Sequence, residues 1–167
     1  GFHLGEKERW AKRSLWEDGT RVPVVVASPG HKPGQKTNRP AELLDVFPTL
    51  LELAGLPADS TQEGQSLVPL MKNPQREWNH PAITSFGLGN YSVRSTRYRF
   101  IQYFDGSREL YDLSKDPHEW KNLIDNPKLE KVIQEHASFI PQKQHPILPG
   151  SSTGHKAYAA AKKKLNK

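Results

Sequence analysis

The sequence predicts an α/β protein, in which part of an α/β sandwich is followed by a small antiparallel sheet packed by one helix. Three observations predict this class: a β-branched run at residues 21–28, an apolar helical stretch near residues 46–54, and short β-rich segments beyond residue 77. The 167 residues suffice for one domain with a small annex. We therefore assign residues 1–77 to the main α/β domain, 78–140 to a C-terminal subdomain and 141–167 to a basic extension.

The β-branched run is RVPVVVAS, which has almost no polar alternation. Such runs are typical of a strand buried on both faces of a parallel sheet. Pro23 lies near its start, where a strand tolerates proline. The sequence holds few strands that could flank this one, so we expect the isolated chain to expose apolar surface here and to self-associate.

The helix of the main domain is predicted in DVFPTLLELAGLP. Asp45 is placed to cap it, and Pro48 falls in the first turn, where its missing N–H costs nothing. Gly55 and Pro57 end the helix. The segment SLVPLMKN is expected to form a further short turn of helix.

The C-terminal subdomain is predicted as an antiparallel sheet of three to four strands. AITSF, NYSVRS, YRFIQYF and RELYDL are rich in β-formers, and Asp105-Gly106 is a strong hairpin signal. In SKDPHEW we expect Asp116 to cap a turn and Glu119 to complete a capping box. NPKLEKVIQEHASFI then places one apolar helical face against the sheet, made of Leu129, Val132, Ile133, His136 and Ile140. His136 is interpreted as a packing residue.

The amino-acid composition of the chain argues against several classes of function. The chain has 24 basic and 18 acidic residues, and five of the lysines lie in residues 151–167, which contain no acid. The body is therefore nearly neutral, and the basic end is typical of a solvated terminus, so nucleic acid is not expected as a partner. There is no Cys, which excludes thiolate metal sites and Cys catalysis within this chain. No stretch approaches the roughly 20 apolar residues of a membrane span, so no membrane partner is expected.

The opening stretch GFHLGEKERWAK gathers cationic side chains around two glycines. One interpretation is a solvated loop before a helix. The other is an oxyanion site, because Lys supplies a point charge to an anionic oxygen and His can donate a proton to a leaving alkoxide. The spacing of His3, Lys7 and Lys12 does not decide between them.

Longer motifs favour the second interpretation, an oxyanion site. The first 30 residues resemble the segment that follows the metal-binding Asp-His pair of formylglycine-dependent sulfatases, especially the iduronate-2-sulfatase-like group of the alkaline phosphatase superfamily. DVFPTLLELAGLP, GQSLVPL, YSVRSTRYRFIQY and ELYDLSKDPHEWKNL resemble later parts of that family, in order, over about residues 1–140. The matching positions in the opening segment are Gly1, Phe2, Leu4, Gly5, Glu6, Trp10, Lys12, Thr20, Arg21, Val22 and Pro23.

The resemblance implies roles for four residues. Lys12 matches the lysine that contacts the sulfate and stabilises the leaving oxygen, so it is the catalytic candidate. His3, at a position where the group varies, and Phe2, at the pocket rim, are substrate-binding candidates. Arg94 either reaches the sugar or pins the sheet.

The resemblance also implies parts that this sequence lacks. The Cys/Ser-x-Pro-x-Arg motif that becomes formylglycine does not occur here, nor does the Asp-His pair. We therefore expect a C-terminal portion whose partner is the N-terminal part of the same protein, whose calcium ligands lie upstream of Gly1, and which is inactive alone. No metal ligand is expected among its own residues. The parent is expected to cleave a sulfated sugar or similar small ester, in the periplasm or outside the cell.

Two alternatives stay open at this point. A relative in the same superfamily could cleave phosphate or phosphonate esters, which the upstream nucleophile would reveal. The chain could instead be a non-catalytic polyanion-binding module that uses its basic end, which predicts salt-sensitive heparin binding lost with residues 151–167.

Overall fold

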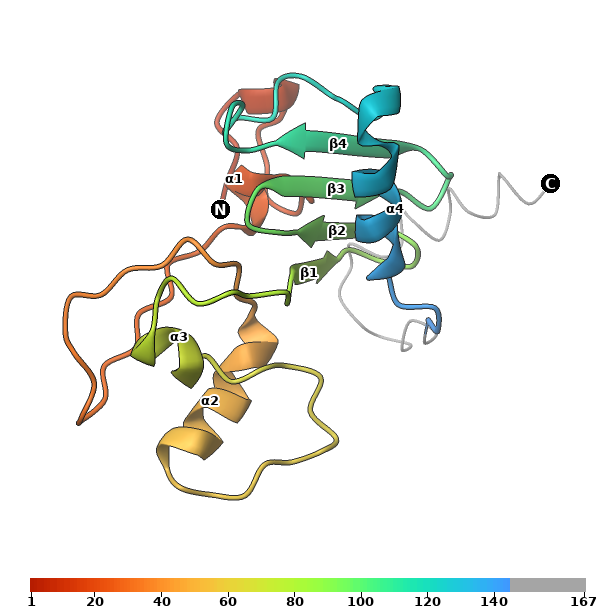
Figure 1. Ribbon diagram of the computed structural model, residues 1–167. Coiled ribbons are helices and arrows are strands. Elements are labelled where there is room, and N and C mark those ends of the chain that lie inside the picture. Colours follow the sequence, from red (N-terminus) through yellow and green to blue (C-terminus); the bar gives the residue numbers. More distant parts are fainter. Residues whose placement is uncertain (145–167) are drawn as a thin grey trace.

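A four-stranded antiparallel sheet is the centre of the structure, a computed structural model that describes residues 1–144 (Figure 1). Its strands are β1 (Ala82–Ser85), β2 (Tyr91–Arg94), β3 (Tyr98–Gln102) and β4 (Arg108–Asp112), and they lie in chain order. The predicted sheet is thus confirmed, and the β3–β4 turn contains Gly106 in the left-handed region at φ 86°, as Asp-Gly hairpins require.

One side of the sheet is apolar. Val93, Phe100 and Leu110 stand side by side on β2, β3 and β4, and none of them is exposed. The 3-10 helix η3 (Pro127–Leu129) leads into α4 (Glu130–Ser138), which packs its Ile133 against this side. The predicted helical face is therefore confirmed, and we call this the helix-facing side of the sheet. Figure 1 shows α4 lying across the strands.

The other side of the sheet carries polar groups. Successive residues of a strand point to opposite faces, so Ser92, Arg99, Ile101 and Tyr111 share the face away from α4. Leu15, with Trp16 beside it, packs here against Ile101 and Tyr111. We call this the loop-facing side, because residues 1–20 cover it with η1 (Glu6–Glu8) and α1 (Glu17–Thr20).

The helices of residues 40–72 lie beyond the β1 edge of the sheet (Figure 1). After η2 (Leu43–Asp45), α2 runs over Val46–Leu53 and α3 over Val68–Lys72, as the sequence predicted. Thr49 joins them, because its Oγ1 accepts a 2.8 Å hydrogen bond from the Leu67 backbone N–H. Asp45 precedes α2, but its carboxylate accepts from the backbone N–H groups of Glu42 and Gln65 and does not cap α2.

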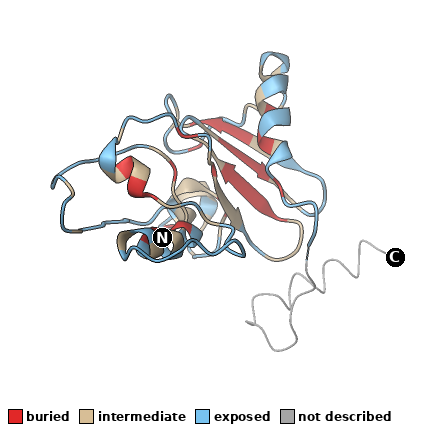
Figure 2. Cartoon of the chain, turned by 60° about the horizontal axis from the view of Figure 1, so that its bottom comes forward, coloured by how far each residue is buried: buried red, intermediate tan, exposed pale blue. Residues whose placement is uncertain are grey.

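The run Arg21–Ser28 is extended but is not a strand, so the prediction of a strand buried on both faces is wrong for this chain. Val25 is 90% exposed, and Val22, Val24 and Val26 are exposed as well. A strand needs a neighbour for its backbone hydrogen bonds, and the described residues supply none here. The predicted exposure of apolar surface is confirmed, while self-association stays a prediction. Figure 2 shows how burial concentrates in the sheet and leaves residues 21–39 mostly at the surface.

No helix within residues 1–144 has the length and apolar character to cross a membrane. Most of the predicted basic extension, residues 145–167, lies outside the described part of the chain.

Candidate functional site

The N-terminal loop, residues 2–12, doubles back on itself. His3 N–H donates to the Ala11 carbonyl (3.0 Å) and Gly5 N–H to the Arg9 carbonyl (3.1 Å). These two hydrogen bonds bring the start and the end of the loop together. Four of its side chains are exposed: Phe2, Leu4, Trp10 and Lys12.

Lys12 is one of these exposed side chains. Arg9 fixes the backbone under it, because its Nη2 donates to the carbonyls of Lys12 (2.9 Å) and Arg13 (3.1 Å). Among the described residues, the Lys12 ammonium has no ion-pair or hydrogen-bond partner. The loop thus holds the backbone in place and leaves a positive charge available to an anion.

His3 faces the opposite way and is completely buried. Its Nε2 lies 2.6 Å from Ser14 Oγ, and its ring meets Trp16 edge-on, with the ring centroids 5.9 Å apart. Its Nδ1 is buried without a hydrogen-bond partner in the described residues. The predicted contact of His3 with substrate stays a prediction, and the described contacts are all within the loop and the segment after it.

Lys7, another basic residue of the opening stretch, points toward the interior. Its Nζ donates to Tyr111 Oη at 3.1 Å and to the Glu119 carbonyl, and it lies 4.4 Å from the centre of the Tyr111 ring. Gly5 makes this turn possible, because its φ of 122° lies in a region that side chains rarely adopt. Of His3, Lys7 and Lys12, the structure thus leaves Lys12 exposed and turns the other two side chains inward.

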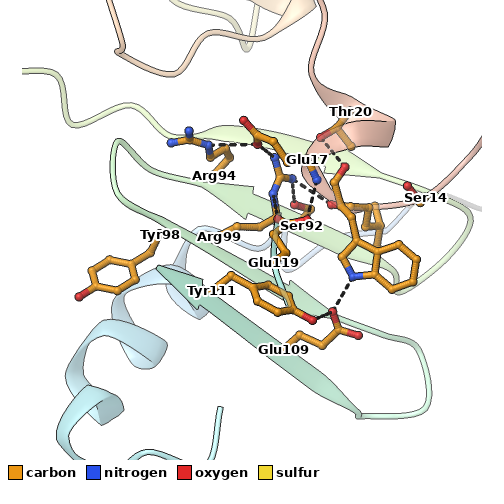
Figure 3. Close-up of polar contacts among 12 residues, drawn as sticks. Ser14, Glu17, Thr20, Ser92, Arg94, Tyr98, Arg99, Glu109, Tyr111 and Glu119 are labelled. Atoms are coloured by element: carbon orange, nitrogen blue, oxygen red, sulfur yellow. Dashed lines mark hydrogen bonds and ion pairs between the residues drawn. The ribbon is translucent and has the colours of Figure 1, made fainter. Parts of the chain in front are cut away.

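A buried ionic network fastens the segment after the loop to the loop-facing side of the sheet (Figure 3). Arg99 is its centre: Nη2 pairs with Glu17, and Nε lies 2.8 Å from Glu119 Oε1. Its Nη1 donates to the Leu15 carbonyl at 2.9 Å and to Ser92 Oγ at 2.5 Å. Glu119 Oε2 in turn accepts from the Glu17 backbone N–H at 2.8 Å, which closes the network.

The expected capping role of Glu119 is wrong. It has a left-handed backbone, with φ 59°, and its side chain turns into the interior toward Arg99. Burial raises the pKa of Glu119, and the nearby Arg99 only partly offsets that effect. Burial also acts on Glu17, but there the charges and hydrogen bonds of Arg99 and Arg94 prevail and lower its pKa. Glu17 is therefore the firmly ionised partner of Arg99.

Arg94 belongs to the same network. Its Nε lies 3.4 Å from Glu17 Oε2, and its Nη1 donates to the Ser95 carbonyl. Two roles were considered for Arg94. These contacts support the structural role, in which it holds the sheet in place, and the contact with a sugar stays a prediction. The structure thus gathers Phe2, His3 and Lys12 in one loop and links Arg94 to them only through Glu17.

Sequence reasoning missed three residues of this network: Glu17, Arg99 and Glu119. One signal was available, because Arg99 lies inside a predicted strand between apolar neighbours, where a charge is costly unless it is paired. Its partners could not be named from the sequence, since they are 82 positions before it and 20 after it.

Comparisons with known proteins fit this arrangement. Residues 5–145 match the family described as "N-sulphoglucosamine sulphohydrolase, C-terminal". The chain belongs to the sulfatase family. A sulfatase of Formosa agariphila is 41% identical over 142 residues, which are 85% of this chain and 28% of that protein. The Δ4,5-hexuronate-2-O-sulfatase of Bacteroides thetaiotaomicron is 34% identical, over 76% of this chain and 29% of that protein.

The fold agrees as well. The solved structure of a 2-O GAG sulfatase superimposes with a TM-score of 0.66 at 30% identity, over 78% of this chain and 31% of that one. The predicted fold class, a sulfatase-type, alkaline-phosphatase-like α/β fold with a C-terminal antiparallel sheet, is therefore confirmed. The chain spans less than a third of the length of these sulfatase relatives, and it corresponds to their C-terminal part. The division of the chain at residue 77 stays a prediction.

Proposed function

We propose that this chain is the C-terminal part of an enzyme that hydrolyses the sulfate ester of a sulfated carbohydrate. The observation that carries the proposal is the exposed Lys12, whose backbone is fixed in an ordered loop in a chain of the sulfatase family. Its ammonium would donate to a sulfate oxygen and stabilise the oxygen of the leaving alcohol as negative charge develops on it.

The substrate class is suggested by the relatives. One of them carries the name Δ4,5-hexuronate-2-O-sulfatase, and another is described as a 2-O GAG sulfatase. Phe2, half exposed in the same loop as Lys12, would shape the rim where a sugar ring would lie. We propose a sulfated saccharide as substrate on this basis, and an exported enzyme in the periplasm or outside the cell.

The nucleophile and the metal are expected outside this chain. We propose that a formylglycine and a calcium ion serve the reaction, with their residues upstream of Gly1. The N-terminal loop does not itself fit a calcium ion: its Glu6 carboxylate accepts from the Leu4 backbone N–H at 2.7 Å, and the exposed Lys12 of the same loop is a cation. In this proposal the Lys12 ammonium is the positive charge that interacts with the sulfate group of the substrate.

The test is Lys12→Ala in the protein expressed at the full length of its relatives. We expect kcat/KM on a sulfated disaccharide to fall by about 10²–10³-fold, the usual loss for one donor to a developing oxyanion. Lys128→Ala, an exposed lysine just before α4, is the matched control and should leave the rate unchanged. An unchanged rate for Lys12→Ala would overturn the assignment of Lys12.

The same assay decides between the ester classes. We expect the wild-type protein to hydrolyse aryl sulfate far faster than the corresponding aryl phosphate or phosphonate monoester. The reverse order would replace sulfate ester hydrolysis by the phosphoryl-transfer alternative.

A further inference from the structure

Glu42, Asp45 and His80 converge beyond the β1 edge of the sheet, away from the N-terminal loop. Glu42 directly precedes η2, Asp45 is the last residue of η2, and His80 precedes β1 by two residues. One ligand atom from each lies within 4.8 Å of the other two. His80 Nε2 is 3.4 Å from Asp45 Oδ1 and 3.8 Å from Glu42 Oε1.

The backbone holds both carboxylates in place. Asp45 is fully buried, and its oxygens accept from the N–H groups of Glu42 (2.9 Å) and Gln65 (2.8 Å). Glu42 Oε2 accepts from the Ile83 N–H at 2.7 Å. Glu42 Oε1 and Asp45 Oδ1 are the carboxylate oxygens that lie near His80 Nε2.

His80 is positioned by its neighbour Trp78. The two rings meet edge-on with centroids 6.1 Å apart, and the indole Nε1 of Trp78 donates to the Pro40 carbonyl at 2.9 Å. The Nε2 atom of His80 is buried and has no hydrogen-bond partner among the described residues. A buried imidazole nitrogen that faces two carboxylates without a hydrogen bond to either has an unsatisfied hydrogen-bonding capacity, which needs an explanation.

The separations point to a shared cation. At 3.4 and 3.8 Å, Nε2 is too far from the two oxygens for good direct hydrogen bonds. Two ligands that each lie about 2.0–2.2 Å from one metal ion, at angles near the tetrahedral value, are themselves separated by roughly this much. Two carboxylates this close in a buried corner also require a positive charge nearby, since burial and mutual repulsion oppose their ionisation.

We propose that Glu42, Asp45 and His80 form a binding site for a divalent transition-metal ion of the zinc type. Imidazole nitrogen with carboxylate oxygens is a donor set that suits such ions, and three protein ligands leave one position for water. The ligands come from two segments, residues 42–45 and residue 80, so the ion ties the start of α2 to the segment that enters β1. This proposal is independent of sulfate ester hydrolysis.

The rival explanation is a protonated His80 that forms an ion pair with both carboxylates and needs no metal. The experiment starts from the full chain, stripped with a chelator and titrated with Zn²⁺ at pH 7.5 against a chromophoric zinc indicator. We expect one site whose affinity falls at least tenfold in His80→Asn and in Glu42→Gln. Gln retains an oxygen for the Ile83 N–H, so this variant preserves the fold. His31→Asn, in a surface loop, is the control and should bind as the wild type does.

Two further readouts keep the result independent of any activity. Co²⁺ should give visible absorption bands in the wild type that are absent from His80→Asn, and saturating Zn²⁺ should raise the melting temperature of the wild type alone. If the wild type binds no Zn²⁺, or binds it as tightly after His80→Asn, the proposal fails. In that case the ion pair explains the cluster.

Discussion

The two sides of the small sheet are fastened to the rest of the molecule in different ways. On the helix-facing side, Ile133 of α4 and Ile140 just beyond its end pack on Phe100 and Leu110, with apolar contact alone between these side chains. On the loop-facing side, residues 14–20 are held by charges and hydrogen bonds centred on Arg99. Apolar contact is non-directional and tolerates small shifts, whereas a guanidinium fork accepts its partners only in fixed positions. The segment that carries the candidate catalytic lysine lies on the side that fixes position.

The largest effect is expected from breaking the polar side. Arg99→Met removes the cation between Glu17 and Glu119, which leaves the buried Glu119 carboxylate without an ion-pair partner and Glu17 with Arg94 alone. Loss of the partner of a buried charge costs about 3–5 kcal/mol in the free energy of unfolding. Urea denaturation measures it. Arg108→Met, on an exposed position of β4, is the control and should change little. A loss below about 1 kcal/mol would show that the network contributes no more than a surface pair.

The apolar side is tested by Ile133→Ala. Truncation of a buried isoleucine costs about 2–4 kcal/mol through lost burial and a residual cavity. Hydrogen exchange distinguishes the two sides: protection should fall first in α4 for Ile133→Ala and first in residues 14–20 for Arg99→Met. Equal loosening of both regions by either variant would mean that the two sides do not act independently.

A smaller effect is expected from pH. His136 on α4 is buried between the Val132 carbonyl (2.8 Å) and Ser95 Oγ (2.9 Å), with the Tyr98 ring edge-on to it, and burial lowers its pKa below the ordinary 6.5. The unfolded chain therefore takes up this proton more readily, so stability is complete above pH 6.5 and falls as the pH drops below it. His136→Gln should flatten that slope between pH 7 and 5, whereas His118→Gln, at an exposed site, should not.

The smallest effect is expected at the Arg97–Asp112 pair, where Arg97 reaches from the β2–β3 turn to the end of β4. Hydrogen bonds from Arg97 lower the pKa of Asp112 from 3.8 to about 2. This group stabilises the fold above pH 3.8, and its contribution disappears as the pH falls toward 2. Arg97→Gln should raise the pKa of Asp112 in an NMR titration. An unchanged pKa would assign the shift to the Ser114 hydroxyl, which also bonds this carboxylate.

Local pattern predicted one side of the sheet far better than the other. The helical face of residues 129–140 and the alternation along β3 identify the apolar core, because both periodicities are properties of a short stretch. The charges of the loop-facing side pair over as many as 82 positions, so no window of sequence reveals which acid meets Arg99. Glu42, Asp45 and His80 were not grouped for the same reason.

The candidate site was predicted in the same uneven way. Lys12 and Phe2 followed from the family motif, and the structure shows both exposed in the N-terminal loop. The motif did not indicate that His3 is buried against Ser14, because the burial of a side chain depends on how the folded loop orients it. The run Arg21–Ser28 shows a further limit: its composition favours a strand, but strand formation depends on a neighbour outside the run.

Lys7 and Glu17 anchor the chain to the sheet five residues before and five residues after Lys12. Residues 8–14 are therefore a short segment that is held at both ends and can be exchanged as a unit in protein engineering. Under the proposed function, we expect that varying exposed side chains of this segment, such as Trp10, would change which sulfated saccharides are accepted while Lys12 is retained. Altered selectivity should therefore be sought by recombining this short segment among sulfatases, with both anchors and Arg99 retained.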